Sequence, residues 1–446
     1  MNNMVDKFKD NAQIAIIYDG KKYSYNELYI KIKEIENFIK DKIKSGEVVA
    51  ILADYSFVSI ALFFALYENK NIIAPITSTS KKEIDGKVKE SFSTKIINLE
   101  NENLVITNIK SKASHKIIND LQNSKCAGLI LFSSGSTGAP KAMIHNLDTL
   151  VDSYGDKKQK QINMLVFLMF DHIGGINTIL NILSMNATMI IPQNRNADDI
   201  CKLIEEYKIA VLPSSPTFLN LILINRSYEK YDLSSLRMIT YGTETMPEGL
   251  LNRLKTVFSK VKFLQTFGTS ETGIAATSSK SSSSTFMKID DENLEYKIVD
   301  NELWLRSKTQ ILGYLNRSME SFTNDGWFKT GDLVELDNEG FIKIIGRNKE
   351  IINVGGQKVL PSEVESVLLG MDEIEDCLVY GEQNAITGQS ISCDVVLKHG
   401  IDDSGFKILV RKFCKDKLDS FKIPTRVNVV QKTEFTERFK KSRIKG

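Results

Sequence analysis

The chain has 446 residues, of which 42% are hydrophobic and 26% are charged, as in an ordinary globular protein. Lysine and arginine (58) nearly balance aspartate and glutamate (56), and the net charge of +2 argues against a general affinity for nucleic acid or membranes. Five cysteines without a CxxC pair and four histidines favour neither a disulfide framework nor a zinc site. We therefore expect a protein of the reducing cytoplasm.

We expect neither a secretory signal nor a membrane span in the N-terminal segments. Residues 1–13 are polar and contain both charge signs, unlike a signal peptide. The most apolar stretch, residues 48–67, is interrupted by polar residues. It predicts a strand at 48–52, a turn and a buried helix at 58–67.

Strand-like and helix-like segments alternate through most of the chain. Short apolar runs lie at 72–75, 128–132, 188–192, 210–213 and 238–241, with amphipathic segments such as 197–208 and 247–258 between several of them. This alternation predicts α/β layers with largely parallel sheets. Residues 294–345 instead have the pattern of closely spaced strands and turns, and the serine run 278–284 is expected to be a solvated loop.

A domain boundary is predicted at residues 346–349 (GRNK). The chain beyond it has its own helical segments (362–369, 403–418) and strands (374–380, 392–397), which is enough for a small domain. Since 446 residues exceed one typical hydrophobic core, we expect an α/β protein of two domains. These are a large N-terminal multi-sheet α/β domain, residues 1–347, and a small C-terminal α+β domain, residues 348–446.

The most informative segment is residues 131–141 (LFSSGSTGAPK), which continues an apolar strand. Glycines let the backbone approach a polyanion closely and turn its N–H groups inward. Hydroxyls add donors, and a lysine adds a positive charge. The segment predicts a phosphate-binding loop made by Ser133, Ser134, Gly135, Ser136, Thr137, Gly138 and Lys141. The alternative is a flexible surface turn.

This loop is not a Walker A motif. Gly135 and Gly138 are three apart, and Ala139 and Pro140 precede the lysine. A Walker A loop has four residues between its glycines and Lys-Ser/Thr directly after the second one, so a P-loop kinase or ATPase is disfavoured. The loop instead resembles the phosphate loop of the adenylate-forming superfamily, which includes acyl-CoA synthetases, luciferases and the adenylation domains of peptide synthetases.

The resemblance extends to residues 265–273 (QTFGTSETG), which are similar to the superfamily's aromatic-Gly-x-Thr-Glu motif with Phe for Tyr and Ser for Thr. It implies that Phe267 stacks beside adenine, that Ser270 binds the α-phosphate and that Glu271 ligates Mg²⁺, a role that suits a hard carboxylate. Further ATP contacts are implied for Thr266 and Gly268 and, where residues 241–244 match the adenine loop, for Gly242, Thr243 and Glu244.

Two further blocks of the superfamily follow. Residues 325–332 (DGWFKTGD) imply Asp332 as the ribose ligand. The block that begins at residue 346 implies that Arg347 contacts ribose or phosphate and that Lys349 is the hinge. Within it, the residues implied to receive the thiol acceptor are Gly355, Gly356 and Lys358. Residues 361–365 (PSEVE) also make a good helix start with Ser362 as N-cap.

The C-terminal residues 436–443 (TERFKKSR) resemble the superfamily's Thr-x-x-Gly-Lys-x-x-Arg ending. The resemblance implies that Lys440 is the mobile catalytic lysine. Phe439 replaces the glycine, and the neighbouring Lys441 leaves the choice of lysine open. The alternative is a basic, frayed tail.

Residues 167–176 (FLMFDHIGGI) fall where the superfamily selects its acid. In the superfamily, acyl and aryl synthetases usually have an aromatic-His-x-x-Gly block here. Amino-acid adenylation domains instead have Phe-Asp-x-Ser, in which the Asp binds the amine of the substrate. This segment resembles both patterns. The spacing to residues 186–187 favours the acyl type, with His172, Gly174 and Asp171 as acyl-pocket residues. A buried Asp171 would need a charged partner, so an amine-bearing substrate stays open.

The resemblance covers nearly the whole chain and implies an AMP-forming carboxylate ligase with ATP and Mg²⁺ as cofactors. A small carboxylic acid would attack the α-phosphorus of ATP and release pyrophosphate. The small, mobile domain would then swing about Lys349 and present CoA or the phosphopantetheine of an acyl carrier protein. The alternatives are an amino-acid-type or amide-forming enzyme, and a nucleotide-binding protein that has lost catalysis, for which Phe439 is the only support.

Overall fold

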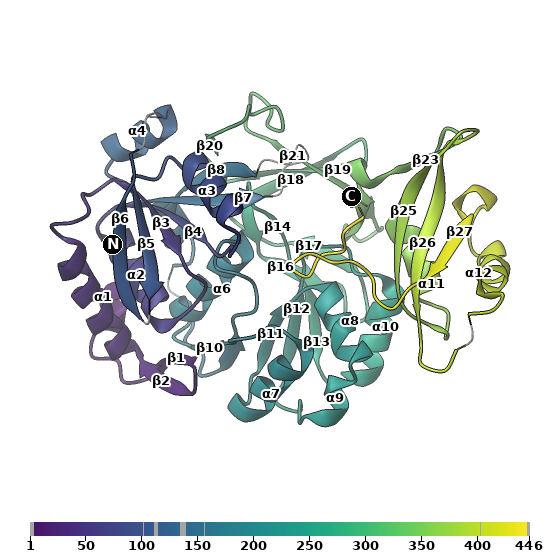
Figure 1. Cartoon of the computed structure of the whole chain (residues 1–446), viewed down its shortest axis with the longest axis horizontal. Coiled ribbons are helices and arrows are strands. Elements are labelled where there is room, and N and C mark those ends of the chain that lie inside the picture. The colour runs from purple at the N-terminus through teal and green to yellow at the C-terminus, as the bar shows by residue number, and fades with distance from the viewer. Residues whose placement is uncertain are drawn as a thin grey trace.

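The computed structural model describes residues 4–100, 102–110, 115–133, 140–155, 157–401 and 403–443. It confirms a mixed α/β fold with a large N-terminal part and a small C-terminal part (Figure 1). In Figure 1 the N-terminal sheets lie at the left and the small C-terminal sheet lies at the right. The last residues of the chain, in yellow, return from the small part to the middle of the molecule.

The first seven-stranded sheet has the strand order β20-β8-β7-β4-β3-β5-β6. Its central strands are parallel, and antiparallel pairs lie at both margins. The strands are β3 (Val48–Leu52), β4 (Ile72–Ile76), β5 (Lys95–Glu100), β6 (Asn103–Asn108), β7 (Gly128–Ser133), β8 (Lys141–Asn146) and β20 (Gly313–Tyr314). β3 and β4 are apolar along their whole length because helices and strands cover both faces of a parallel sheet.

The second seven-stranded sheet has the order β13-β12-β11-β9-β10-β1-β2 and is parallel except for β2. Its strands are β1 (Ile14–Tyr18), β2 (Lys21–Ser24), β9 (Asn163–Leu165), β10 (Thr188–Ile191), β11 (Val211–Ser214), β12 (Met238–Tyr241) and β13 (Lys262–Gln265). The segments that follow β12 and β13 carry predicted site residues. Ligands bind at the carboxyl ends of parallel strands, so the topology gathers these segments at one edge.

Helices pack between and around these two sheets. The most buried is α2 (Phe57–Glu68), in which 11 of the 12 residues are buried; it begins at the N-cap Ser56, whose hydroxyl accepts the Ser59 N–H at 3.0 Å. The others are α1 (Tyr25–Ile39), α3 (Lys81–Glu90), α4 (Lys116–Asn123), α5 (Leu147–Asp152), α6 (Ile173–Ser184), α7 (Ala197–Tyr207), α8 (Pro216–Ile224), α9 (Ser227–Lys230) and α10 (Glu248–Val257). Within the described ranges, no helix has the length and apolar character needed to cross a bilayer.

An antiparallel sheet of order β16-β17-β22-β21-β19-β18 and the hairpin β14-β15 complete the large part. Their bounds are β14 (Phe267–Thr269), β15 (Gly273–Ala275), β16 (Thr277–Ser279), β17 (Phe286–Ile289), β18 (Leu294–Val299), β19 (Glu302–Ser307), β21 (Phe328–Leu336) and β22 (Ile342–Arg347). A 3₁₀ turn, η2 (Asn348–Glu350), then leads into the small part.

The small C-terminal part has one sheet of order β24-β23-β26-β25, with β27 added in parallel to β26. Its elements are β23 (Ile352–Val354), β24 (Gln357–Val359), α11 (Pro361–Leu368), β25 (Ile374–Asn384), β26 (Gly388–Leu397), α12 (Phe406–Lys415) and β27 (Arg426–Val429). Helix α11 packs against α10 of the large part, so the two parts share an apolar boundary.

The expectation for the serine run is wrong in part. Residues 278–279 belong to β16. The hydroxyl of Ser279 accepts the Gln265 N–H at 2.8 Å, and that of Ser282 accepts the Phe263 N–H at 3.2 Å. Strand β13 is the edge of its sheet, so these serines satisfy backbone donors that no neighbouring strand can bind.

The prediction of Ser362 as an N-cap is also wrong. Helix α11 begins at Pro361 after Leu360, which provides no side-chain cap. The hydroxyl of Ser362 instead donates to the carbonyl of Ile345 on β22. Pro fits the first helical position because its missing N–H has no partner there in any case, and Ser362 ties the helix to the preceding sheet.

We expect Ser279→Ala to leave the Gln265 N–H on the β13 edge without its acceptor. An unsatisfied backbone donor costs roughly 1–3 kcal/mol, so the melting temperature should fall by several degrees, as differential scanning calorimetry can measure. The control is Ser283→Ala, in the same run, because the Ser283 side chain is exposed. Equal melting temperatures for the two variants would contradict the capping role.

Candidate functional site

A cavity of about 680 Å³ lies between the large part and the C-terminal tail, which we define as residues 430–443. Its walls come from the ends of β7 and β8, the start of α6, the segments after β12 and β13, the strand β21, the turn η2 and residues 436–440. The predicted site residues that line it are Ser133, Lys141, His172, Gly174, Gly242, Thr243, Thr266, Phe267, Gly268, Ser270, Glu271, Arg347, Lys349 and Lys440. Blocks that lie hundreds of residues apart in the sequence therefore meet in one space.

Several predicted residues do not line this cavity. Glu244, Asp332 and Asp171 lie behind its walls, and the predicted thiol-acceptor residues Gly355, Gly356 and Lys358 are exposed in and around the β23–β24 turn of the small part. The loop residues Ser134, Gly135, Ser136, Thr137 and Gly138 lie outside the described residues.

The cavity is rich in positive charge. Its lining includes seven lysine or arginine side chains and three glutamates within the described ranges, namely Lys87, Lys141, Lys329, Arg347, Lys349, Arg438, Lys440, Glu83, Glu271 and Glu437. Charge of one sign in a partly enclosed cleft raises the local concentration of ligands of the other sign. The chemistry of the lining therefore suits a polyanion.

One side chain holds the backbone on both sides of Lys141, at the C-terminal end of the predicted phosphate loop. Asn316, which follows β20, accepts the Ala142 N–H at 3.1 Å and donates to the Pro140 carbonyl at 2.9 Å. The Lys141 ammonium lies 5.8 Å from the centre of the Tyr314 ring, within range of a cation–π contact. Lys141 is thus fixed at the cavity wall with its charge unpaired by any carboxylate among the described residues.

Ser270 and Glu271 lie in the tight connection between β14 and β15. Gly268 allows this hairpin to close, because a Cβ there would lie 2.4 Å from the Gly273 carbonyl oxygen. The Tyr314 hydroxyl donates to Glu271 Oε1 at 3.0 Å, and Glu271 lines the cavity.

No group of three His, Cys, Asp or Glu side chains that could hold a metal exists in the described part of the chain. Mg²⁺ typically binds through one or two carboxylates together with substrate phosphates and water. Glu271, one of the three glutamates that line the cavity, fits a magnesium ion that arrives with its nucleotide rather than a resident metal cage.

The two predicted ribose ligands contact each other. Asp332 on β21 and Arg347 on β22 are register partners, and Arg347 Nε donates to Asp332 Oδ1 at 2.7 Å. Burial raises the pKa of Asp332, although Arg347 opposes the shift. Arg347 reaches the cavity, whereas Asp332 lies beneath it.

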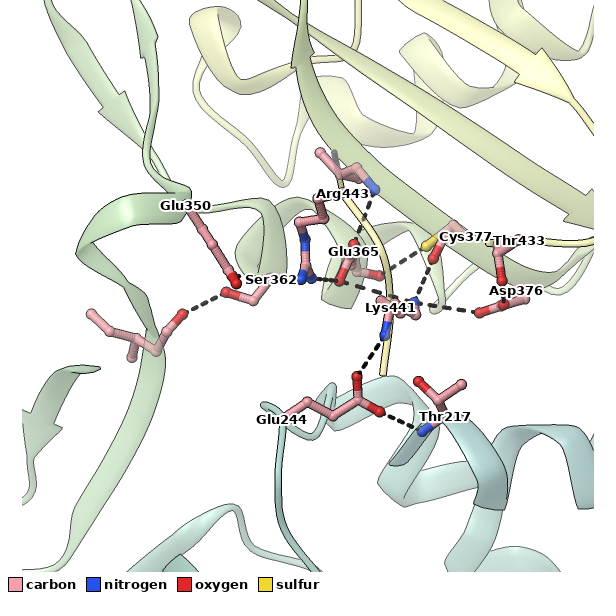
Figure 2. Close-up of polar contacts among 12 residues, drawn as sticks. Thr217, Glu244, Glu350, Ser362, Glu365, Asp376, Cys377, Thr433, Lys441 and Arg443 are labelled. Atoms are coloured by element: carbon pink, nitrogen blue, oxygen red, sulfur yellow. Dashed lines mark hydrogen bonds and ion pairs between the residues drawn. The ribbon is translucent and has the colours of Figure 1, made fainter. Parts of the chain in front are cut away.

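Lys440, rather than Lys441, faces the cavity. Burial, with Arg347 and Arg438 nearby, lowers the pKa of Lys440 to about 8. The side chain of Lys441 points the other way, toward Asp376 and Glu365 of the small part, with the Nζ–Asp376 Oδ1 distance 3.4 Å (Figure 2). Burial alone would lower the pKa of Lys441, but the two carboxylates hold it well above its usual range.

The tail is bound to both parts of the molecule, as Figure 2 shows. The backbone N–H of Lys441 donates to Glu244 Oε2 at 3.1 Å, while Glu244 Oε1 accepts the Thr217 N–H at 2.8 Å. Arg443 pairs with Glu365 at 2.8 Å and with Glu350 of the η2 turn at 3.5 Å. Glu244, predicted as an ATP contact, thus holds the tail.

His172 caps helix α6, and its Nδ1 accepts the Gly174 N–H at 3.0 Å. Burial lowers the pKa of His172 well below its usual value, and Lys440 and Arg438 act in the same direction. The ring is therefore neutral at physiological pH, and its Nε2 carries the proton.

Asp171 has two cationic partners. Its Oδ2 lies 3.2 Å from Lys87 Nζ on α3 and 3.1 Å from an Arg438 guanidinium nitrogen, and its side chain is only 1% exposed. The partner that a buried carboxylate needs is thus supplied by the protein itself. Asp171 is not offered to a substrate amine in this arrangement.

Phe439 occupies a backbone conformation that favours glycine, with φ of +51°. The Thr436 carbonyl accepts the Phe439 N–H at 2.9 Å, and the Thr436 N–H donates to the Lys440 carbonyl at 2.8 Å. This is a tight turn followed by a left-handed residue, the position at which hairpins use glycine. A side chain there costs roughly 1–2 kcal/mol, so the ring must gain contacts that compensate.

The sequence of the chain matches a known protein family. Residues 6–315 match the family described as AMP-binding enzyme, and residues 363–440 match its C-terminal domain. The first match alone covers more than half of the chain. The chain belongs to the AMP-binding enzymes. It is an adenylate-forming, acid–CoA-ligase-like enzyme, and the family uses ATP.

Curated relatives and solved structures agree with this assignment. A 2-succinylbenzoate–CoA ligase of Bacillus licheniformis is 24% identical over 94% of this chain and 93% of its own length. A 4-coumarate–CoA ligase-like protein of Arabidopsis thaliana is 25% identical over 85% of this chain and 77% of its own. The structure of an anthranilate CoA ligase with anthranoyl-AMP superposes with a TM-score of 0.82 at 20% identity, covering 98% of this chain and 95% of that one, which bears on the fold.

Four side chains of this AMP-binding enzyme were not predicted from its sequence as site residues. Lys87 and Arg438 contact the predicted residue Asp171, and Tyr314 contacts the predicted residue Glu271. Asn316 binds the backbone on either side of the predicted residue Lys141. Residues 313–315 (GYL) fit the spacing of the superfamily, but this fit assigned no role to Tyr314. Nothing in the sequence distinguishes Lys87 as a site residue, because it is one of four lysines in a mostly polar helix.

The pH dependence of the first reaction tests the environment of Lys440. If the ammonium form is needed at the phosphate, kcat/KM for ATP should fall as the pH rises through about 8, because the protonated fraction is lost there. Lys440→Arg keeps its charge at all these pH values, so its slower profile should lack this inflection. The same inflection in both proteins would assign it to another group.

Proposed function

We propose that this protein activates a small carboxylic acid as an acyl-adenylate with release of pyrophosphate, and then transfers the acyl group to the thiol of CoA or of a carrier-protein phosphopantetheine. One observation carries the proposal. Lys440 from the tail, Lys141 at the end of the predicted phosphate loop, and the Ser270–Glu271 connection line a single cavity.

The first step forms a bond between a substrate carboxylate oxygen and the α-phosphorus and breaks the bond to the pyrophosphate oxygen. Lys440 would lie between the two anionic reactants and neutralise the charge that develops, and Lys141 would stabilise the leaving pyrophosphate. Mg²⁺, held by Glu271, would supply further charge neutralisation at the phosphates. Positioning of the reactants in line provides much of the remaining acceleration.

An organic acid without an amine suits the acyl side of the cavity better than an amino acid does. Asp171 is already neutralised by Lys87 and Arg438. The neutral His172 contributes an Nε2–H donor, which can bind a carboxylate without adding charge. Enzymes similar to this chain are named for several different acids, so the acid has to be identified by measuring activity with a panel of acids.

The second step needs a rearrangement of the small domain, which we propose to span residues 348–446 with its hinge at Lys349. The exposed turn at Gly355 and Gly356 lies away from the cavity, and both residues have positive φ values of +58° and +86°. Rotation about η2 would withdraw Lys440 and bring this turn, with Lys358, toward the thiol.

The function is tested by carboxylate-dependent exchange of labelled pyrophosphate into ATP across a panel of aliphatic, aromatic and amino acids. We expect exchange with at least one acid, and AMP rather than ADP as the product of complete turnover. Exchange with none of the acids would support a protein that has lost catalysis, and release of ADP would indicate a phosphotransferase.

Lys440→Ala should reduce pyrophosphate exchange by about 10²–10³-fold, since it removes a preorganised charge at the transition state. Thioester formation from supplied acyl-AMP should be retained, because that step does not form the phosphate bond. The control is Lys432→Ala, an exposed lysine of the same tail. Equal loss of both steps would contradict the separation of roles.

Lys358→Ala should weaken the thiol step and leave exchange unchanged. We expect a rise of several-fold in the KM for CoA, because an exposed cation near the proposed acceptor path is lost. Lys407→Ala on α12 removes an exposed lysine elsewhere on the small domain and serves as the control. An unchanged KM for CoA would remove Lys358 from the acceptor site.

A further inference from the structure

Phe439 departs from the pattern of its family, and its ring lies in a pocket of the large domain. The ring centre is 5.3 Å from that of Phe167 and 5.1 Å from that of Phe218. Phe167 and Phe218 contact each other at 4.3 Å and are fully buried. Aromatic pairs at these separations stabilise each other beyond the area they bury.

The backbone of Phe439 is held at the same place. Ser215, the N-cap of α8, accepts the Phe218 N–H at 3.2 Å and donates its hydroxyl proton to the Phe439 carbonyl at 2.8 Å. One side chain of the large domain therefore fixes both the helix that supports the aromatic pocket and the tail residue that fills it. The space left beneath this part of the tail has a volume of about 10 Å³, at the lower limit for one water molecule.

Arg438 makes a second, independent contact with the large domain. One guanidinium nitrogen pairs with the buried Asp171, and another donates to the Phe132 carbonyl at 3.4 Å. Phe132 lies on β7, directly before the predicted phosphate loop. The two residues that precede Lys440 thus bind elements on two different walls of the cavity.

We propose that Phe439 and Arg438 are positioning residues that latch the tail onto the large domain and thereby hold Lys440 in the adenylate-forming arrangement. A glycine at position 439 would satisfy the turn but could not occupy the aromatic pocket. The strained backbone is retained because the ring gives the latch. The inference rests on the proposed function for its kinetic consequence, but the latch itself is a structural claim that can be measured without any substrate.

The latch predicts opposite effects on the two steps. Leaving the latched arrangement requires Phe439 to leave its pocket and Arg438 to leave Asp171, so the latch favours the first reaction and retards the domain rotation before the second. Phe439→Gly should lower pyrophosphate exchange about tenfold, while thioester formation from supplied acyl-AMP stays equal or increases. Arg438→Gln should act in the same direction, with Lys87 still paired to Asp171.

Spin labels report the latch directly. Exposed Ile30 on α1 and Ile386 between β25 and β26 can be replaced by cysteine in a Cys126→Ser background, since the other four cysteines are buried. We expect one dominant interdomain distance for the ligand-free protein with the wild-type tail, and an additional population in Phe439→Gly.

The matched control is Phe435→Ala. Phe435 stacks on Phe439 from within the tail and has no ring contact with the large domain among the described residues. The Phe435→Ala variant should keep the single interdomain spin-label distance and the wild-type rate of pyrophosphate exchange. An unchanged distance distribution in Phe439→Gly, an equal shift in Phe435→Ala, or equal loss of both half-reactions in Phe439→Gly would overturn the latch. If the wild-type protein catalyses neither step, the proposed function fails, and the spin-label distances still decide the latch.

Discussion

The position of the Lys440 ammonium group in the cavity depends on the C-terminal tail, which is bound to both domains. The tail carrying Lys440 is bound to the large domain through Glu244 and Asp171 and to the small domain through Glu365. Asp171 and Glu365 are almost fully buried, so their ionic contacts with the tail are screened little by salt. The cavity is complete only while both sets of contacts hold.

Buried carboxylates pair with cations of the protein itself, and the lining of the cavity keeps an excess of positive charge. Asp332 pairs with Arg347 and Asp171 with Lys87 and Arg438, which places acidic groups behind the wall and basic groups on it. A polyanion can then replace water around Lys141 and Lys440 without having to displace a carboxylate that is bound to them among the described residues. The cavity lining also includes three glutamates, and one of them is Glu271, the predicted magnesium ligand.

Much of the fold followed from the sequence because the buried strands are apolar runs between clear turns. The predicted strands at 48–52 and 238–241 coincide with β3 and β12. β25 extends from the predicted end at residue 380 to Asn384, because the outer half of its long hairpin with β26 is polar and shows no apolar signal. The serine run was misjudged because its hydroxyls serve an edge strand that is close in space rather than in sequence.

Many of the predicted motif residues line one cavity, whereas the residues that orient them could not be predicted. Motif blocks identify Ser270, Glu271 and Lys440 without knowledge of the fold, but Lys87 and Arg438 acquire their role only when α3 and the tail meet at Asp171. The decision between Lys440 and Lys441 has the same origin. Adjacent residues in a turn point in opposite directions, and sequence alone does not give the direction.

The ion pair between Arg443 and Glu350 connects the C-terminal tail to the turn between the two domains. Glu350 lies in the turn that joins the two domains, and Arg443 lies only three residues beyond Lys440. The ion pair thus links the turn η2 directly to the residues that follow Lys440, in addition to the connection through the body of the small domain. In the rotation proposed for the second step, a change of backbone angle at the turn would act on the tail through this one side-chain contact, and release of the tail would act on the turn by the same route.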